Sequence, residues 1–244
     1  MNPQVLLLRH GDEERRAYFA VAEETELHAA AARPESFLGA SELALFGALR
    51  FAAKRQGFLL GRLAAKRALG ALLAEPDWCR IEICSGAFGQ PLVRHPRAGG
   101  FEVSVSHSLG FAVALAYPDG LPMGVDLESV AAAAAGTILG ELQTSPAEEA
   151  WLAAGSVGEP TACGVLWTAR EALGKSMKIG LNCPLGVLAL GQIEVGGAAA
   201  WAGRYANFPQ SRCLSQEIEG RVLSIAMPMA LELEPWPLAW QLRA

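Results

Sequence analysis

Two acidic residues one position apart, Asp126 and Glu128, are the strongest candidates for chemistry in this sequence. They belong to the stretch G-V-D-L-E at 124–128, whose alternation of apolar and acidic residues is typical of a strand. Because alternate side chains of a strand share a face, both carboxylates would point the same way, with Val125 and Leu127 packed behind them. Two carboxylates held this close repel each other unless a cation or a proton lies between them. Hard oxygen ligands beside a phosphorylated substrate suit Mg²⁺, whereas the alternative is a solvated pair on an exposed strand face.

A second stretch that could do chemistry is W-T-A-R-E-A-L-G-K at 167–175. On a helix, Glu171 and Lys175 are four residues apart and share a face, which is also the spacing of an ordinary stabilising ion pair. Upstream, T-S-P-A-E at 144–148 predicts the start of a helix with proline in its first turn. Glu148 could then be a third carboxylate for the cation, or an acid that compensates the helix dipole.

Basic residues gather on a predicted helix earlier in the chain. Its apolar positions 59, 60, 63, 64 and 68 share one side, and Arg62 and Lys66 lie four residues apart on another. Together with Lys54 and Arg55 they form a local basic cluster in an acidic protein. The cluster is either a solvated helix face or, beside a candidate metal site, a binding surface for a phosphorylated ligand.

The stretch F-E-V-S-V-S-H-S at 101–108 alternates apolar and polar residues and predicts a strand that ends in a hydroxyl-rich corner. His107, in this corner, could donate a hydrogen bond to a phosphate. The alternative is a histidine with a purely structural role. A turn marked by glycine and proline, which contains Gln90, precedes this strand.

Composition narrows the class of protein. With 244 residues, 52% hydrophobic and 18% charged, the chain can bury a sizeable core and is not disordered. A net charge of −5 argues against broad electrostatic binding to nucleic acid. No signal peptide and no membrane span are recognisable, so we expect a soluble cytoplasmic protein. The five cysteines show no C-x-x-C spacing and are expected to be reduced, mostly buried thiols.

An alternative function comes from Arg9-His10-Gly11, which follows a short apolar stretch. This tripeptide resembles the signature of the histidine phosphatases, in which the histidine takes a phosphoryl group. That function needs a second catalytic histidine late in the chain, but the last histidine is His107. The alternative is the end of a strand that enters a polar loop.

Two short segments of the first half recur in the second half in the same order. A-K-R-A-L-G at 65–70 matches A-R-E-A-L-G at 169–174, and the stretch at 110–118 matches that at 220–228. The repetition predicts two related α/β lobes in an α+β protein, with a boundary near 118–122 and a ligand cleft between them. We therefore expect an N-terminal lobe over 1–120 and a C-terminal lobe over 121–244.

In combination, these motifs resemble one known family, the two-lobed, Sfp-type 4′-phosphopantetheinyl transferases. The resemblance covers roughly residues 40 to 185, and its most specific part is the pairing of G-x-D-x-E with W-x-x-[KR]-E-x-x-x-K. The motifs are F-L-L-G-R-L-A-A-K at 58–66, G-x-P at 89–91, S-V-S-H-S at 104–108, G-V-D-L-E at 124–128, S-P-A-E at 145–148 and W-T-A-R-E-A-L-G-K at 167–175.

The resemblance implies a fold of two pseudo-symmetric α/β lobes and an activity. In this family, phosphopantetheine passes from coenzyme A to a serine of an acyl or peptidyl carrier protein, in fatty acid or secondary metabolite biosynthesis. The reaction depends on Mg²⁺ and releases adenosine 3′,5′-bisphosphate. The implied partners are coenzyme A and the carrier protein, without nucleic acid or membrane, and the protein is expected to be a monomer.

The resemblance also implies roles for individual residues. Glu171 would take the proton of the serine, and Lys175 would bind the phosphate under attack. His107 and Ser106 would contact the pyrophosphate region. The implied Mg²⁺ ligands are Asp126, Glu128 and Glu148, and the implied contacts of the ribose 3′-phosphate are Arg62 with Lys54, Arg55 or Lys66.

Three positions depart from the family pattern. Gln90 stands where a lysine or arginine usually precedes the proline, Arg170 replaces a lysine, and Lys178 replaces a glycine. None of them touches the four acids or Lys175, so an active enzyme is expected. The departure at Gln90 motivates an alternative, a coenzyme A- or carrier-protein-binding module that has lost turnover.

Overall fold

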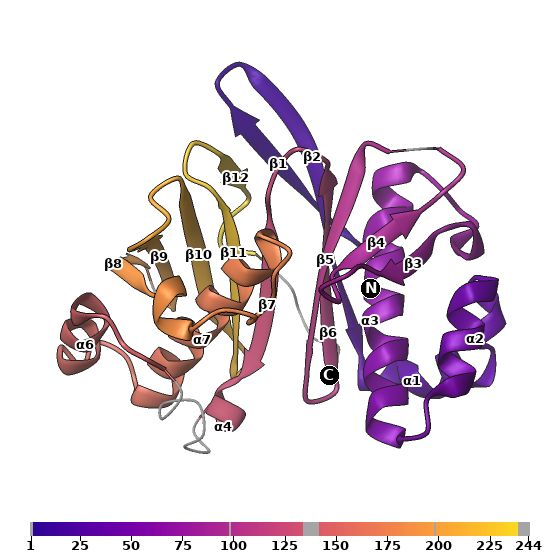
Figure 1. Cartoon of the computed structure of the whole chain (residues 1–244), viewed down its shortest axis with the longest axis horizontal. Coiled ribbons are helices and arrows are strands. Elements are labelled where there is room, and N and C mark those ends of the chain that lie inside the picture. The colour runs from indigo at the N-terminus through magenta and orange to yellow at the C-terminus, as the bar shows by residue number, and fades with distance from the viewer. Residues whose placement is uncertain (1, 98, 134–141, 198, 239–244) are drawn as a thin grey trace.

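Two long helices, α3 (Ala52–Leu73) and α7 (Glu159–Ser176), each pack against an antiparallel five-stranded sheet. In the computed structural model, which describes residues 2–97, 99–133, 142–197 and 199–238, the two helix–sheet units lie side by side as two lobes (Figure 1). The prediction of an α+β protein with two pseudo-symmetric α/β lobes is therefore confirmed.

The first sheet has the strand order β12-β1-β2-β6-β5. Helix α3 covers one of its faces, and the apolar side predicted for this helix is buried there, as at Leu59 and Leu63. A separate hairpin, β3 with β4, lies beside the helix (Figure 1). The elements are β1 Gln4–His10, β2 Glu13–Glu23, η1 Glu24–Glu26, α1 Leu27–Ala32, η2 Pro34–Ser36, α2 Ala40–Ala48, η3 Trp78–Arg80, β3 Glu82–Ser85, β4 Pro91–Arg94, β5 Phe101–Ser108, β6 Phe111–Pro118 and β12 Glu232–Glu234.

The second sheet has the order β7-β11-β10-β9-β8 and is covered on one face by α7. Its elements are β7 Gly124–Ser129, α4 Val130–Ala133, α6 Pro146–Ala153, η4 Leu185–Leu188, β8 Leu190–Gly197, β9 Ala200–Tyr205, β10 Ser211–Ile218 and β11 Arg221–Pro228.

The faces of the two sheets that point away from the helices share one hydrophobic core. Side chains from β1, β2 and β6 of the first sheet pack there against side chains from β7, β10 and β11 of the second. Leu8, Phe19 and Leu115 meet Val125 and Ile225 in this cluster. The result is a layered arrangement of helix, sheet, sheet and helix, so that the lobes are joined by apolar packing.

The repeated segments occupy equivalent places in the two lobes. The first pair lies in α3 and α7, and the second pair forms β6 and β11. Each of these strands follows a two-residue hairpin turn in which both residues have positive φ, at Leu109-Gly110 and at Glu219-Gly220. Such pairs of positive φ are typical of type I′ turns, whose twist matches that of the flanking strands.

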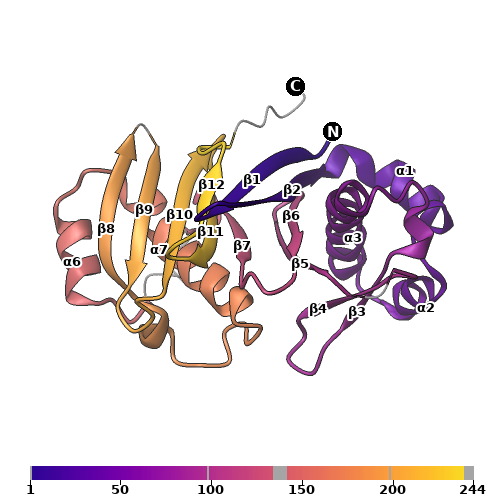
Figure 2. The same cartoon turned by 90° about the horizontal axis from the view of Figure 1, so that it is seen from above.

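The expected boundary at residue 120 falls in the connection between β6 and β7. Strand β12 comes from the second half of the chain but pairs with β1, so the first sheet contains strands from both halves. Figure 2 shows β1 reaching across to this strand. All five cysteines are free, two buried and three partly exposed, so burial is less complete than the sequence analysis expects. Within the described residues, no helix combines the length and apolar character needed to span a bilayer.

Candidate active site

Strand β7 presents its two acids as the alternation predicts. Val125 and Leu127 are buried between the sheets, while Asp126 and Glu128 point to the other side of the strand. At Gly124, an added Cβ would lie 2.0 Å from the carbonyl oxygen of Ala172, so glycine lets β7 pass directly against helix α7. Asp126 is 4% exposed and Glu128 is partly buried. The strand therefore holds both carboxylates at the contact with the helix.

Helix α7 brings Glu171 and Lys175 to these acids. The Nζ atom of Lys175 donates to Oδ1 of Asp126 at 2.5 Å. Burial first, and then the charges of Asp126 and Glu128, raise the pKa of Glu171 to about 7, although the charge of Lys175 lowers it. Three acids and one lysine thus lie in electrostatic contact. A carboxyl group whose pKa is close to neutrality is suited to exchange a proton during a reaction.

Strand β5 completes this group with serine side chains. Ser106 Oγ donates to Oδ1 of Asp126 at 2.6 Å, and Ser108 Oγ donates to Oε1 of Glu128. The sequence analysis expects Ser106 in the coenzyme A site, whereas the structure places its hydroxyl on Asp126. The alternating serines are visible in the sequence, but only the packing of the lobes reveals which acids they contact.

Glu148 lies elsewhere, and the expectation that it joins the two acids of β7 is corrected. It is fully buried, and its carboxylate accepts from the amides of Ser145 at 2.8 Å and Leu190 at 2.9 Å. It also pairs with the fully buried Arg170 at 2.5 Å. Through these hydrogen bonds and the ion pair, Glu148 connects α6 to α7 and β8, which is a structural role. Within the described residues, no group of three His, Cys, Asp or Glu side chains is arranged to hold a metal ion.

The predicted basic cluster divides into two kinds of residue. Lys66 is fully buried, where its Nζ atom pairs with Glu42 at 2.5 Å and donates to the Ile81 carbonyl at 2.6 Å. Arg55 donates to the carbonyl of Phe46 at 2.9 Å and stacks on its ring. Lys66 is thus committed to buried partners around α2 and η3, while Arg55 is held against α2 and does not line the cavity described next.

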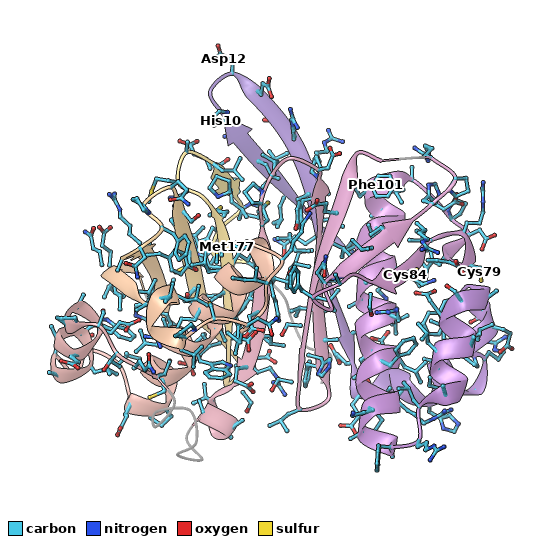
Figure 3. All side chains as sticks on the ribbon, in the orientation of Figure 1. His10, Asp12, Cys79, Cys84, Phe101 and Met177 are labelled. Carbon is cyan, nitrogen blue, oxygen red and sulfur yellow. The ribbon has the colours of Figure 1, made fainter. Side chains whose placement is uncertain are left out.

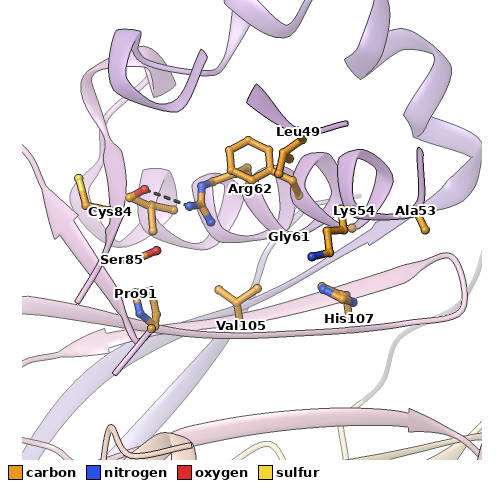
Figure 4. A pocket seen from close by; sticks show the side chains of 14 residues that line it. Leu49, Ala53, Lys54, Gly61, Arg62, Cys84, Ser85, Pro91, Val105 and His107 are labelled. Carbon is orange, nitrogen blue, oxygen red and sulfur yellow. Dashed lines mark hydrogen bonds between the residues drawn. The ribbon is translucent and has the colours of Figure 1, made fainter. Parts of the chain in front are cut away.

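Arg62 and Lys54 line a cavity of about 680 Å³ between α3, the β3–β4 hairpin and β5 (Figure 4). Arg62 is held by Glu42 at 3.1 Å and by the carbonyl of Ile83 at 3.0 Å. Burial lowers the pKa of its guanidinium. Lys54 is exposed at the opposite end of the cavity. His107 also lines this cavity from β5, while Ser106 and Ser108 of the same strand face β7.

A second cavity, of about 200 Å³, adjoins the first and extends to Lys175. The two share Gly89, Pro91 and Val105, and the second is lined by Lys175 from the other lobe. A ligand that occupies both would reach from the cations of α3 to the lysine beside Asp126. A third hollow, of about 520 Å³, adjoins His107 on its other side.

The three departures from the family pattern have different surroundings. Gln90 lies in the second cavity, but its Oε1 accepts from the amide of Phe88 at 2.9 Å, so the side chain folds onto its own turn. Arg170 points away from the site into its pair with Glu148, so the expectation that none of the departures touches one of the four acids is wrong. Lys178 adopts a left-handed φ of 61° and pairs with Glu102 across the lobes.

His10 lies apart from every one of these cavities. It is exposed at the end of β1, on the hairpin that projects beyond the lobes, as Figure 3 shows. The structure thus gives it the position of a strand end entering a polar turn. A histidine phosphatase site would require a second histidine in contact with His10. None is found in the described part of the chain.

Glu42 was missed by the sequence analysis, although it organises the wall of the first cavity. It is fully buried at the third position of α2, contacts both Arg62 and Lys66, and accepts from the amide of Ile83 at 3.2 Å. An acid at the third position of a predicted helix is a capping signal in the sequence. Its cationic partners on α3 become visible only in the fold.

Comparison with known proteins gives the following similarities. No protein-family model matches the chain, and no curated protein sequence matches it. Among solved structures, the chain is similar to a holo-(acyl-carrier-protein) synthase from Bacillus anthracis in complex with CoA (3′,5′-ADP), at 21% identity and a TM-score of 0.39, over 46% of this chain and 96% of that one.

Two further structures are similar over a comparable share of the chain. The Helicobacter pylori holo-[acyl-carrier-protein] synthase in complex with coenzyme A is 20% identical, with a TM-score of 0.36 over 42% of this chain and 99% of that one. The Thermotoga maritima holo-[acyl-carrier-protein] synthase is 28% identical, with a TM-score of 0.35 over 44% and 67%. These descriptions agree with the family that the motifs resemble, but at such TM-scores the likeness carries no argument about activity.

Proposed function

We propose that this protein transfers 4′-phosphopantetheine from coenzyme A to a serine hydroxyl of an acyl or peptidyl carrier protein, with Mg²⁺, and releases adenosine 3′,5′-bisphosphate. The observation that supports this most is that two adjoining cavities lead from Arg62 and Lys54 to Lys175, whose ammonium pairs with Asp126 and whose charge acts on Glu171. Phosphoryl transfer needs positioned cations, acids and a base rather than covalent chemistry from the protein, which is the arrangement found here.

The first cavity is proposed to bind the nucleotide end of coenzyme A. Its volume lies in the range of ordinary ligand sites, and its walls combine apolar surface with Lys54, Arg62 and His107. Arg62 pairs with Glu42 through Nε and donates to the Ile83 carbonyl through Nη2, and Nη1, which has no partner among the described residues, is proposed to donate to a phosphate. A guanidinium held in this way loses little freedom when it binds an anion.

The acids of β7 are proposed to hold Mg²⁺ together with the pyrophosphate. The donor set fits, because Mg²⁺ in phosphate sites is commonly held by one or two carboxylates plus substrate oxygens rather than by an all-protein cage. Burial raises the pKa of Glu171, and the nearby charge of Asp126 raises it as well, so negative charge lies close together at this place. When bound, the ion supplies charge stabilisation to the phosphoryl oxygens and the leaving group.

Glu171 is proposed to act as the general base. The serine oxygen of the carrier attacks the β-phosphorus of coenzyme A, its proton passes to the Glu171 carboxylate, and the bond from that phosphorus to the bridging oxygen breaks. The electron pair of the broken bond leaves with adenosine 3′,5′-bisphosphate. Lys175 is proposed to stabilise negative charge on the phosphoryl oxygens, which is supported by its position in the lining of the second cavity. His107, which lines the first cavity from β5, is proposed to contact the pyrophosphate.

One chain supplies both halves of the proposed site. The N-terminal lobe provides the coenzyme A cavity, and the C-terminal lobe provides the acids and the helix that carries Glu171. Because no residue from a second copy is needed, we propose that the protein acts as a monomer, in the cytoplasm, on a carrier protein whose serine enters beside Lys175.

The test is the intact mass of an apo carrier protein after incubation with this protein, coenzyme A and Mg²⁺, with an EDTA control. A gain equal to the phosphopantetheine group, only in the presence of metal, is the expected result. Several acyl and peptidyl carriers should be offered in parallel, because the identity of the partner is open. No gain with any carrier would contradict the proposed activity.

The alternative, a coenzyme A- or carrier-binding module without turnover, is favoured by one observation. Gln90 folds onto its own turn, so the second cavity lacks a cation at this position. Titration calorimetry separates the two, since binding of coenzyme A without any mass gain on the carriers would identify the binding module.

A further inference from the structure

We infer that Ser106 and Ser108 are positioning residues, by which strand β5 of the N-terminal lobe holds the two carboxylates of the C-terminal lobe ready for a cation. The inference deepens the proposed function and rests on it for the identity of the reaction. The hydrogen bonds on which it depends are properties of the chain itself.

Strands β5 and β7 meet without a backbone ladder. Within the described residues, β5 pairs only with β6, and β7 pairs only with β11, so each is an edge strand of its own sheet. Three alternate serines of β5 bridge the two edges instead. Ser104 Oγ accepts from the amide of Val125 at 2.9 Å, and Ser106 and Ser108 donate to the acids.

The alternation along β5 separates two tasks. Val105 and His107 face the large cavity of the N-terminal lobe, whereas the three serines face β7. All three serines are buried, with exposed fractions of 4, 7 and 9% along the strand. Where water is largely excluded, a carboxylate depends on protein donors for its solvation and its orientation.

The serines use only one oxygen of each carboxylate. Ser106 and Lys175 both donate to Oδ1 of Asp126, while Ser108 and the amide of Ser129 both donate to Oε1 of Glu128. In the described part of the chain, no donor reaches Oδ2 of Asp126 or Oε2 of Glu128. The geometry therefore fixes the direction of each carboxylate and leaves one oxygen of each free for a ligand. Residues that hydrogen-bond to metal ligands orient these ligands and tune the affinity for the metal ion.

The experiment compares Ser106→Ala with a matched control, Ser104→Ala. Both variants remove a buried hydroxyl from the same face of the same strand, but Ser104 contacts a backbone amide and no acid. The first readout is binding of Mn²⁺, a Mg²⁺ substitute, to the protein without coenzyme A, measured by electron paramagnetic resonance. The others are the melting temperature and the separate kcat and KM for coenzyme A.

We expect Ser106→Ala to weaken Mn²⁺ binding by about 10-fold and to lower kcat with little change in KM. Ser108→Ala should act in the same direction, and Ser106→Thr, which keeps the hydroxyl, should restore affinity. Ser104→Ala should lower the melting temperature but leave Mn²⁺ affinity within about 2-fold.

Equal Mn²⁺ affinity in Ser106→Ala and Ser104→Ala would overturn the inference, and so would absence of Mn²⁺ binding in the wild-type protein. If Ser106→Ala fails to fold, Ser108→Ala is compared with Ser104→Ala in its place. The proposed activity fails separately. Loss of Mn²⁺ affinity in Ser106→Ala, with no modification of any carrier by the wild type, would support the positioning role and reject the transferase.

Discussion

Both lobes contain a buried ion pair at the equivalent position of the long helix. In each, a fully buried cation of the long helix pairs at 2.5 Å with a fully buried glutamate, Lys66 with Glu42 and Arg170 with Glu148. Both glutamates occupy the third position of a short helix, and both accept a backbone amide from the start of a strand region. The repeat matches Lys66 to Arg170, so the pair belongs to the shared framework and not to the site.

The lobes differ at the next position of the repeat. Arg67 of α3 binds Glu26 and the carbonyl of Val21, whereas its counterpart Glu171 of α7 faces Asp126. Strand register extends the difference. The repeat matches Ala114 to Ser224, and these residues pair with Ala20 and Asp126 respectively. The N-terminal lobe thus carries alanine where the C-terminal lobe carries its acid.

The large cavity lies in the N-terminal lobe, whereas the reactive acids lie in the C-terminal lobe. Gly61 of α3 lines the large cavity, whereas Val165, its counterpart on α7, is buried against Trp201. A second tryptophan, Trp151, packs edge-on against Trp201 at 6.4 Å and fills this part of the C-terminal lobe. One framework therefore keeps a hollow in one lobe and reactive side chains in the other, and the site forms where the two meet.

The largest effect is expected from Glu171→Gln. Removal of a general base typically costs about 10²–10⁴-fold in rate, because the base acts in the transition state. Coenzyme A affinity, measured by calorimetry, should change little, while carrier modification, followed by mass spectrometry, should nearly stop. The matched control is Arg67→Gln at the equivalent position of α3, which should reduce stability and leave kcat unchanged. Parallel loss of affinity and rate in Glu171→Gln would argue against its role as base.

The buried pairs provide the next test. Removing one partner of a buried ion pair typically costs about 3–5 kcal/mol, so Glu42→Ala and Glu148→Ala should both lower the free energy of unfolding strongly. Their responses to pH should differ, since Lys66 can lose its proton and Arg170 cannot. Burial already lowers the pKa of Lys66, so Glu42→Ala should regain stability as the pH rises.

Denaturant unfolding at two pH values measures both effects, and Mn²⁺ affinity serves as the control. Glu148→Ala, where it remains folded, should keep that affinity because its carboxylate lies in the framework. A loss of Mn²⁺ binding in Glu148→Ala, without loss of folding, would indicate that Glu148 is a ligand of the cation.

Gly61→Val would give α3 the residue that α7 has at the equivalent position, Val165. A Cβ at this position lies 3.5 Å from Val105, an ordinary contact, so the helix should accept the change while the cavity narrows. We expect coenzyme A to bind about 10-fold more weakly, which is a typical consequence of misfit by one to two carbon atoms. Gly47→Val on α2, where an added Cβ meets nothing, is the control for helix propensity. Unchanged affinity in Gly61→Val would place coenzyme A outside this cavity.

The pH dependence of stability tests the environment of Glu171. Its pKa is raised from 4.5 to about 7, so the folded chain holds this proton more tightly than the unfolded chain. Its contribution therefore favours the fold at low pH and is lost as the pH rises from about 4.5 to about 7. Above that range, Glu171→Gln should melt about 2–4 °C above the wild type, or ~1 kcal/mol for a chain of this size. Without divalent cations, the two curves should converge near pH 5, and a constant gap would contradict the assignment.

Sequence patterns predict this molecule well where they report local geometry. Alternation places Asp126 and Glu128 on one face, and helical spacing brings Glu171 and Lys175 together, as the structure bears out. The pattern at 144–148 correctly predicts a helix start with Glu148 in its first turn. The patterns do not reveal the buried cationic partner of Glu148 or the buried acidic partner of Lys66, because these partners lie on elements distant in the chain. The serines of β5 show the same limit, because their partners belong to the other lobe.

The smallest effects are expected where the two long helices end. Each is followed by a residue other than glycine in the left-handed region, Ala74 with φ 49° and Lys178 with φ 61°. Glycine normally occupies such positions, and relief of the strain is worth about 1 kcal/mol. Ala74→Gly should therefore raise the free energy of unfolding by about this amount. Lys178→Gly should gain less, because it also removes the ion pair with Glu102 that joins the lobes.

The difference between these two gains measures that ion pair. Lys178 is 47% exposed at its side chain, and exposed pairs contribute about 0–1 kcal/mol, less at high salt. Glu102→Gln should therefore destabilise the wild type slightly and leave Lys178→Gly unaffected, which a double-mutant cycle in denaturant can resolve. Equal gains at both helix ends would mean that the pair between Lys178 and Glu102 contributes nothing to the stability of the chain.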